Sequence, residues 1–119
     1  MAGYKLTVRL TGATERSRFE TLDGALAALE ARLDELAADG RLPPARALAR
    51  EYEPVRQVAA RGEIAGPDGL RGGVDLRGDG SAEAFTGRLR RAVVEPEPGE
   101  TAYDALRRAL GGPDGLRRA

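Results

Sequence analysis

The chain has 119 residues, the length of one small domain, and its 19 basic and 19 acidic residues give no formal net charge. Cysteine and histidine are both absent, which excludes disulfides, thiolate or imidazole metal sites, cysteine nucleophiles and histidine-based triads. The sequence holds no charged-then-apolar leader and no apolar run of about 18 residues, so we expect a cytoplasmic protein without a membrane partner.

The composition is rich in arginine and poor in amides. Lys5 is the only lysine, asparagine is absent, and Gln57 is the only glutamine. Loss of thermolabile residues is thermophile-like, but a GC-rich bacterial genome gives the same bias, and we favour that explanation. Alanine supplies much of the 41% hydrophobic fraction, which predicts a thin core. Because a thin core is often completed by a partner, we expect a homodimer.

The first third of the chain predicts a hairpin followed by a helix. Residues 4–10 alternate between apolar and polar side chains, which is typical of a half-buried strand. Thr11-Gly12-Ala13 can turn this strand back toward a short partner that contains Phe19. Thr21 then caps an amphipathic helix whose leucines recur at steps of four and three. These leucines are Leu22, Leu26, Leu29, Leu33 and Leu36, and Gly40 ends the helix.

The middle of the chain predicts a three-stranded meander. Residues 44–52 are ambiguous, since Pro44 could open a short second helix. From Val55 onward the period changes to two, and turn residues at 66–69 and 78–81 separate three strands. The inward positions that we assign are Val58, Ala60, Gly62 and Ile64, then Leu70, Gly72, Val74 and Leu76, then Phe85, Gly87 and Leu89.

Arg91 falls among the inward positions of the last predicted strand. Because an unpaired buried charge is costly, we expect Arg91 to meet a buried carboxylate, unless a bulge near 90–91 turns Ala92 and Val94 inward instead.

The chain ends in a second predicted helix. Thr101 and Asp104 have the spacing of a capping box, and Tyr103, Leu106 and Leu110 form its buried stripe. Residues 112–119 are expected to be a flexible C-terminal tail. We therefore predict that residues 1–119 form a single α+β domain, with about five mostly antiparallel strands and two helices on one face. The predicted element order is β-β-α-β-β-β-α.

The sequence also contains an internal echo of the first hairpin. The matching positions are Val8-x-Leu10-x-Gly12 and Val74-x-Leu76-x-Gly78, with Phe19 and Phe85 at the same spacing after each valine. One interpretation is a duplicated hairpin-helix unit. The other is that hairpins and helix starts reuse the same few residue types.

The outward positions of the predicted strands are rich in cations. They carry Lys5, Arg9, Arg16, Arg18, Arg61, Arg71, Arg77, Arg88 and Arg90, against Glu20, Glu63 and Asp75. The first helix is instead mostly acidic. From the basic set we select a candidate surface for an anion or a protein partner, formed by Arg61, Arg71, Arg77, Arg88 and Arg90. The competing interpretation is an ordinary solvated sheet face.

Three functions remain, ranked by what the residues favour. The first is a non-enzymatic interaction module that self-associates and binds a protein partner. The alternative is a weak, sequence-independent binder of nucleic-acid phosphates, because no aromatic ring is assigned to the basic face for stacking on bases. The third is a small carboxylate-dependent enzyme. We assign no catalytic residue, metal ligand or cofactor, since no spacing singles out a pair of carboxylates.

Overall fold

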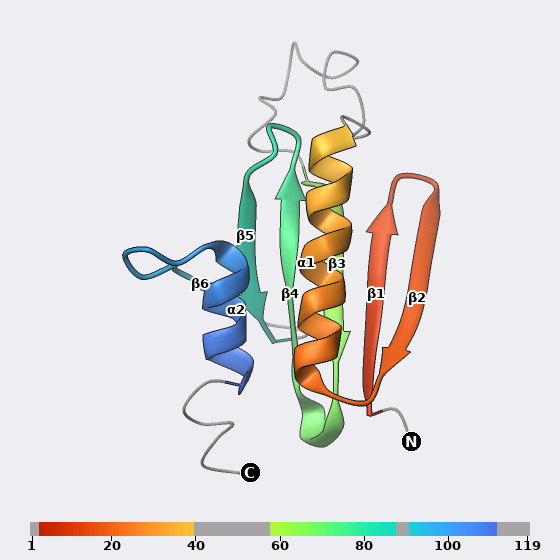
Figure 1. Cartoon of the computed structure of the whole chain (residues 1–119), viewed down its shortest axis with the longest axis vertical. Coiled ribbons are helices and arrows are strands. Elements are labelled where there is room, and N and C mark those ends of the chain that lie inside the picture. Colours follow the sequence, from red (N-terminus) through yellow and green to blue (C-terminus); the bar gives the residue numbers. More distant parts are fainter. Residues whose placement is uncertain (1–2, 40–57, 88–90, 112–119) are drawn as a thin grey trace.

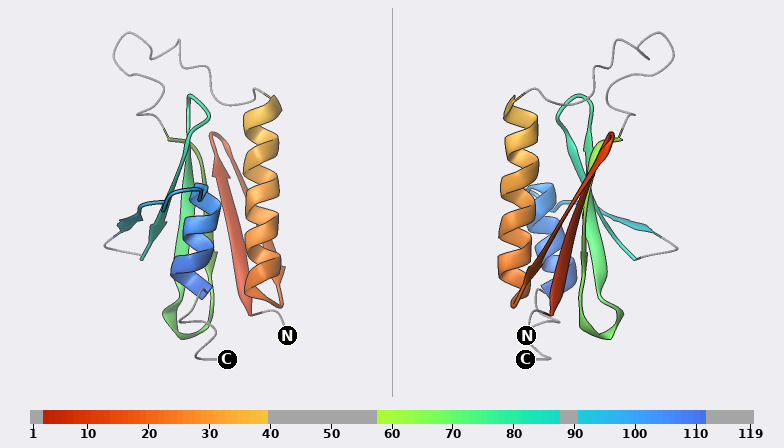
Figure 2. Two further views of the ribbon diagram at one scale, coloured as in Figure 1. Left: turned by 60° about the vertical axis from the view of Figure 1, so that its left-hand side comes forward. Right: turned by 90° about the vertical axis from the view of Figure 1, so that its right-hand side faces the viewer.

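The computed structural model describes residues 3–39, 58–87 and 91–111, and shows one antiparallel sheet with two helices on the same side of it (Figures 1 and 2). The elements are β1 (Tyr4–Leu10), β2 (Ala13–Phe19), α1 (Leu22–Asp39), β3 (Val58–Ala65), β4 (Arg71–Arg77), β5 (Ala82–Thr86), β6 (Ala92–Val94) and α2 (Ala102–Gly111). The six strands lie in the order β2-β1-β3-β4-β5-β6. The predicted α+β class and element order are confirmed, with one strand more than expected. The uncertain helix at 44–52 and the predicted tail at 112–119 lie outside the described residues.

The first helix forms where the leucine spacing predicts it. The Thr21 Oγ1 accepts a hydrogen bond from the Gly24 N–H at 3.0 Å, which satisfies one of the unpaired donors of the first turn. The inner leucines are buried against the sheet, and Leu29 fills a hollow above β3. A Cβ at Gly62 would lie 2.0 Å from the Leu29 Cδ1, so the glycine allows the helix to approach closely.

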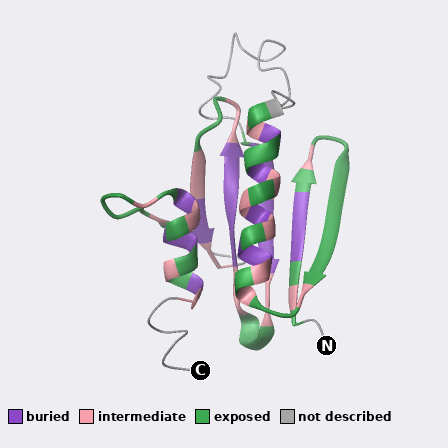
Figure 3. Ribbon diagram, in the orientation of Figure 1, coloured by how far each residue is buried: buried purple, intermediate pink, exposed green. Residues whose placement is uncertain are grey.

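The second helix begins with the predicted capping box. The Asp104 N–H donates to the Thr101 Oγ1, and the Thr101 N–H donates to the Asp104 Oδ2, each at 3.1 Å. Leu106 and Leu110 are buried on the sheet, both within 3.1 Å of where a Cβ of Gly72 would stand. Figure 3 shows that the buried residues lie mainly where the two helices face the inner strands. Within the described part of the chain, no helix is both long and apolar enough to cross a membrane.

The prediction for the last strand of the meander is wrong in two respects. It is divided into β5 and β6, because β5 ends at Thr86 and Gly87 takes a positive φ of 95°. Its faces are also reversed, since Ala84 lies opposite Val74 on the helix side while Phe85 lies opposite Gly73 on the other. The β4–β5 turn fixes this register, and sequence hydrophobicity alone had favoured Phe85 as the inward residue.

The observed strand faces also bear on two further expectations, the inward position of Val58 and the equivalence of Phe19 and Phe85. A register shift between Val58 and Ala60 leaves Val58 42% exposed, although alternation had placed it inward. Phe19 packs on the helix side of the sheet whereas Phe85 lies on the opposite side, so these two positions of the internal echo are not equivalent. The duplication stays a hypothesis.

We expect Leu29→Ala to lower the free energy of unfolding by about 2–5 kcal/mol, because it removes a fully buried side chain that fits the Gly62 hollow. Chemical denaturation measures the change, with the exposed Ala31→Ser in the same helix as the control. An unchanged unfolding midpoint for Leu29→Ala would contradict this packing of α1.

Candidate binding surface on the helix-free face

The face of the sheet that carries no helix, which we call the helix-free face, buries polar groups at its centre. Thr7, Glu63 and Asp75 are each less than a tenth exposed. They come from three adjacent strands, β1, β3 and β4, and share the parity that points away from the helices. Buried carboxylates are stable only when they are paired, so their partners decide how charge is distributed here.

Asp75 is paired with Arg61, one of the residues of the predicted site. The two residues lie directly opposite each other on β4 and β3. The Arg61 Nε donates to the Asp75 Oδ1 at 2.5 Å, and its Nη2 donates to the Oδ2 at 3.1 Å, which gives a two-point contact. Hydrogen bonding to Asp75 raises the pKa of the Arg61 guanidinium. Arg61 is therefore held within the protein by a carboxylate of the neighbouring strand.

Glu63 is paired with two cations. The Arg91 Nη2 lies 3.3 Å from its Oε2, and the Arg9 Nε lies 3.9 Å from its Oε1. Glu63 is the buried carboxylate that the sequence predicts for Arg91. The contact forms on the helix-free face because the register of this part of the sheet differs from the predicted one, and Val94 packs toward the helix side.

Phe85 lies in the middle of this network. A Cβ at Gly73 would stand 2.9 Å from the Phe85 Cζ, so the ring lies close over the glycine backbone. The guanidinium carbons of Arg91 and Arg61 lie 4.6 and 5.7 Å from the ring centroid. The expectation that this face has no ring is wrong, but Phe85 is only 3% exposed and offers no open surface for stacking on bases.

The remaining residues of the predicted site lie in different situations. Arg77 donates to the Glu83 carboxylate at 2.5 Å, and Glu83 belongs to the helix-free face because the faces of β5 are reversed. Arg71 has no ion pair among the described residues. Arg88 and Arg90 lie outside the described residues. The structure thus places Arg61 and Arg77 in ion pairs with neighbouring strands.

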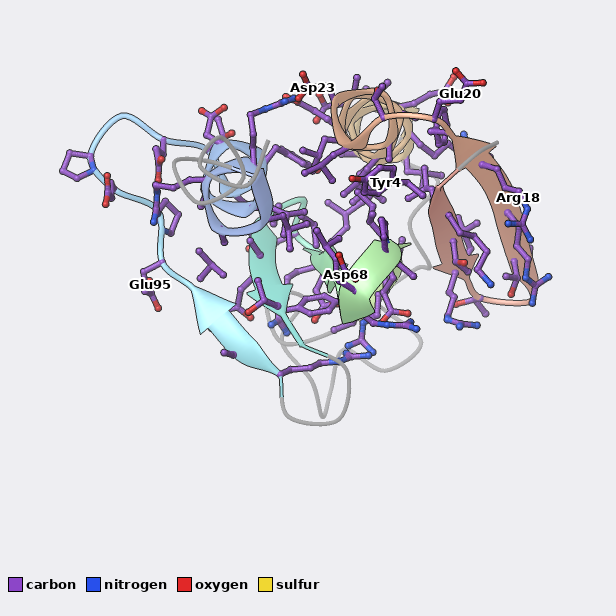
Figure 4. The ribbon with its side chains drawn as sticks, turned by 90° about the horizontal axis from the view of Figure 1, so that it is seen from below. Tyr4, Arg18, Glu20, Asp23, Asp68 and Glu95 are labelled. Carbon is purple, nitrogen blue, oxygen red and sulfur yellow. The ribbon has the colours of Figure 1, made fainter. Side chains whose placement is uncertain are left out.

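Three other cations of this face remain unpaired. Lys5, Arg16 and Arg18, which we call the ribbon cations, are exposed on the β1–β2 ribbon and form no ion pair within the described residues. Lys5 lies opposite Arg18, and Arg16 lies opposite Thr7. Figure 4 shows Arg18 at the outer edge of the ribbon. The sequence predicts that all three lie on the basic face. It does not reveal that the central arginines form ion pairs, whereas the ribbon cations form none within the described residues.

The other side of the ribbon is tied to α1. The Arg32 Nε and Nη2 donate to the two carboxylate oxygens of Glu15 at 2.9 and 2.7 Å. This hydrogen bonding lowers the pKa of Glu15. Because Glu15 points toward α1, its charge is neutralised on the helix side and does not offset the ribbon cations.

A cleft of about 910 Å³ lies at the end of the sheet seen in Figure 4, between the start of α1, the end of α2 and the β3–β4 turn. Its lining includes an ion pair between Asp23 and Arg107, together with Asp68 and Arg71. Both signs of charge are present, so the cleft favours no class of ionic ligand. The described residues contain no cluster of three or more carboxylates placed to hold a metal ion.

Comparisons with protein-family models, with curated proteins and with solved structures found no match to this chain. Its function is therefore argued from the geometry of this surface.

We expect Gly73→Ala to destabilise the protein by about 3 kcal/mol, because a methyl group there would stand 2.0 Å from the Gly62 carbonyl oxygen as well as against Phe85. Gly3→Ala is the matched control, since a Cβ at Gly3 meets nothing within 4 Å. Thermal unfolding compares the two variants. Equal stability would mean that the backbone of β3 and the Phe85 ring do not approach Gly73 as described.

Proposed function

We propose that the protein is a cytoplasmic, non-enzymatic interaction module that binds an acidic protein partner through the ribbon cations. One observation carries the proposal: the cations at the centre of the helix-free face are paired with carboxylates, whereas Lys5, Arg16 and Arg18 are exposed and unpaired within the described residues. A partner's carboxylates can pair with the ribbon cations without breaking an existing ion pair. Charge complementarity of this kind gives specificity and a faster association.

Nucleic-acid phosphates are the alternative ligand, because unpaired guanidinium groups also bind phosphate. We favour a protein partner since the ribbon presents few cations and no exposed ring, while the neutral chain has no bulk attraction to a polyanion. The enzyme hypothesis gains no support from the described carboxylates, because the two buried ones are both in ion pairs.

The ribbon is tested with Arg16→Gln combined with Arg18→Gln. Binding of fluorescein-labelled polyglutamate, followed by anisotropy at low salt, should weaken about tenfold, since two exposed ion pairs of up to about 1 kcal/mol each are lost. Arg71→Gln with Arg107→Gln is the control, because it removes the same charge outside the ribbon, from β4 and α2. This control should keep the affinity within about twofold.

The same titration separates the alternatives. An equal loss in both double variants would assign binding to net charge and contradict a ribbon site. A random DNA duplex that binds more tightly than polyglutamate, with an affinity that falls steeply as salt rises, would favour the phosphate alternative.

We also propose that the chain self-associates, as the thin core predicts. Val93 is 51% exposed on β6, which is the edge strand opposite to β2, and an apolar side chain at a sheet edge supports pairing there. Light scattering at micromolar concentration should report a dimer, and Val93→Lys should shift it toward the monomer. A monomer at every concentration of the unmodified chain would contradict the proposal.

A further inference from the structure

We propose that the acidic partner binds as an added β-strand along the free edge of β2, with its carboxylates on the helix-free face. This inference rests on the proposed function and specifies how the partner is held. Proteins commonly bind extended segments in this way, since main-chain hydrogen bonds supply affinity and alternate side chains supply specificity.

The edge of β2 is long and open. Among the described strands β2 has a neighbour on one side only, and all of its seven residues except Phe19 are exposed. It pairs with β1 in an unbroken register from Ala13 to Phe19, without a bulge or a proline. An edge of this kind presents a regular row of main-chain donors and acceptors to an incoming strand.

The main-chain groups that face the free edge belong to the same residues as the cations. Thr11 and Gly12 form a two-residue turn between Leu10 and Ala13, which makes the latter two a hydrogen-bonded pair. Antiparallel pairing alternates hydrogen-bonded and non-hydrogen-bonded pairs, so Thr14, Arg16 and Arg18 direct their N–H and C=O groups away from β1. Their side chains share the helix-free face with Lys5.

The two faces of the edge select different side chains. On the helix-free face an added strand meets Arg16 and Arg18, and directly opposite residues have Cβ atoms about 5 Å apart, close enough for ion pairing. On the helix side it meets Ala13, Ser17 and the Glu15 carboxylate already bound to Arg32. The best ligand is therefore an extended segment in which acidic residues alternate with uncharged ones.

A second copy of β2 fits this edge poorly. We consider antiparallel pairing about a two-fold axis in the registers that pair at least five residues of β2. These registers bring Arg16 opposite its own copy, opposite Arg18, or diagonally next to its own copy with Glu15 facing Glu15. Like charges on adjacent strands destabilise the pair. The cations thus oppose self-pairing at this edge and favour an acidic strand, and the homodimer proposed above would use another surface.

The experiment compares two synthetic peptides of equal charge, four repeats of Val-Glu and the same sequence N-methylated at every residue. Full N-methylation removes every N–H that strand pairing needs, whichever way the peptide runs, so the second peptide retains the carboxylates but cannot pair. We expect the Val-Glu peptide to bind at least about tenfold more tightly, as measured by fluorescence anisotropy. Thr14→Pro should remove this difference because it removes an outward N–H and no charge. Thr14→Val, which retains the N–H, should preserve it.

The outcomes distinguish this inference from the proposed function. If both peptides bind equally and Arg16→Gln with Arg18→Gln weakens both, strand addition is overturned while the ribbon site stands. If neither peptide nor polyglutamate binds, both proposals are overturned. Circular dichroism checks that Thr14→Pro is folded, and the peptide comparison on the unmodified protein decides the question if it is not.

Discussion

The burial of Glu63 and Asp75 on a sheet face without a helix determines where the free positive charge of this protein lies. Two carboxylates that are about a tenth exposed must be matched by cations, because an unpaired buried charge costs several kcal/mol. Arg61 and Arg91 supply that match from β3 and from the residue before β6. These arginines are thereby fixed to the scaffold, and only the cations out of reach of the buried carboxylates remain free to meet a partner. The proposed binding surface is therefore chosen by asking which cations are already paired. A count of charges on the face would instead have selected the paired central arginines.

Adjacent glycines let the two faces of β4 be covered in different ways. Gly72 leaves room for Leu106 and Leu110 on the helix side, while Gly73 leaves room for the Phe85 ring on the other. On that second face the ring and the guanidinium groups above it cover the sheet in place of a helix. This arrangement is limited to the inner strands, since the cover comes from β3, β5 and Arg91. The β1–β2 ribbon lies beyond it, which is why its cations are exposed.

Local pattern predicted the elements, but pairing between strands decided the site. Leucine spacing and capping residues identified α1 and α2, because a helix closes its hydrogen bonds within its own segment. The faces of β5 were assigned wrongly because Phe85 is more hydrophobic than Ala82 or Ala84, while the actual register follows from the turn after β4. The partners of Arg61 and Arg91 lie 14 and 28 residues away along the chain, so no local spacing reveals them. The predicted site therefore held Arg61 and Arg77, which the structure shows to be paired, and left out the ribbon cations.

A chain without net charge can still select an acidic partner, because screening makes charge recognition local. At physiological ionic strength the Debye length is about 8 Å, so a segment on the β2 edge responds to charges on its own and the next strand. The acidic outer side of α1 is a separate environment, where burial and the carboxylates of Asp34 and Glu30 raise the pKa of Tyr103. Glu15, the acid closest to the ribbon cations in sequence, is directed to α1 and bound by Arg32. The fold thus separates the two signs of charge, and this separation supports the proposal that the β2 edge binds acidic strands in preference to copies of itself.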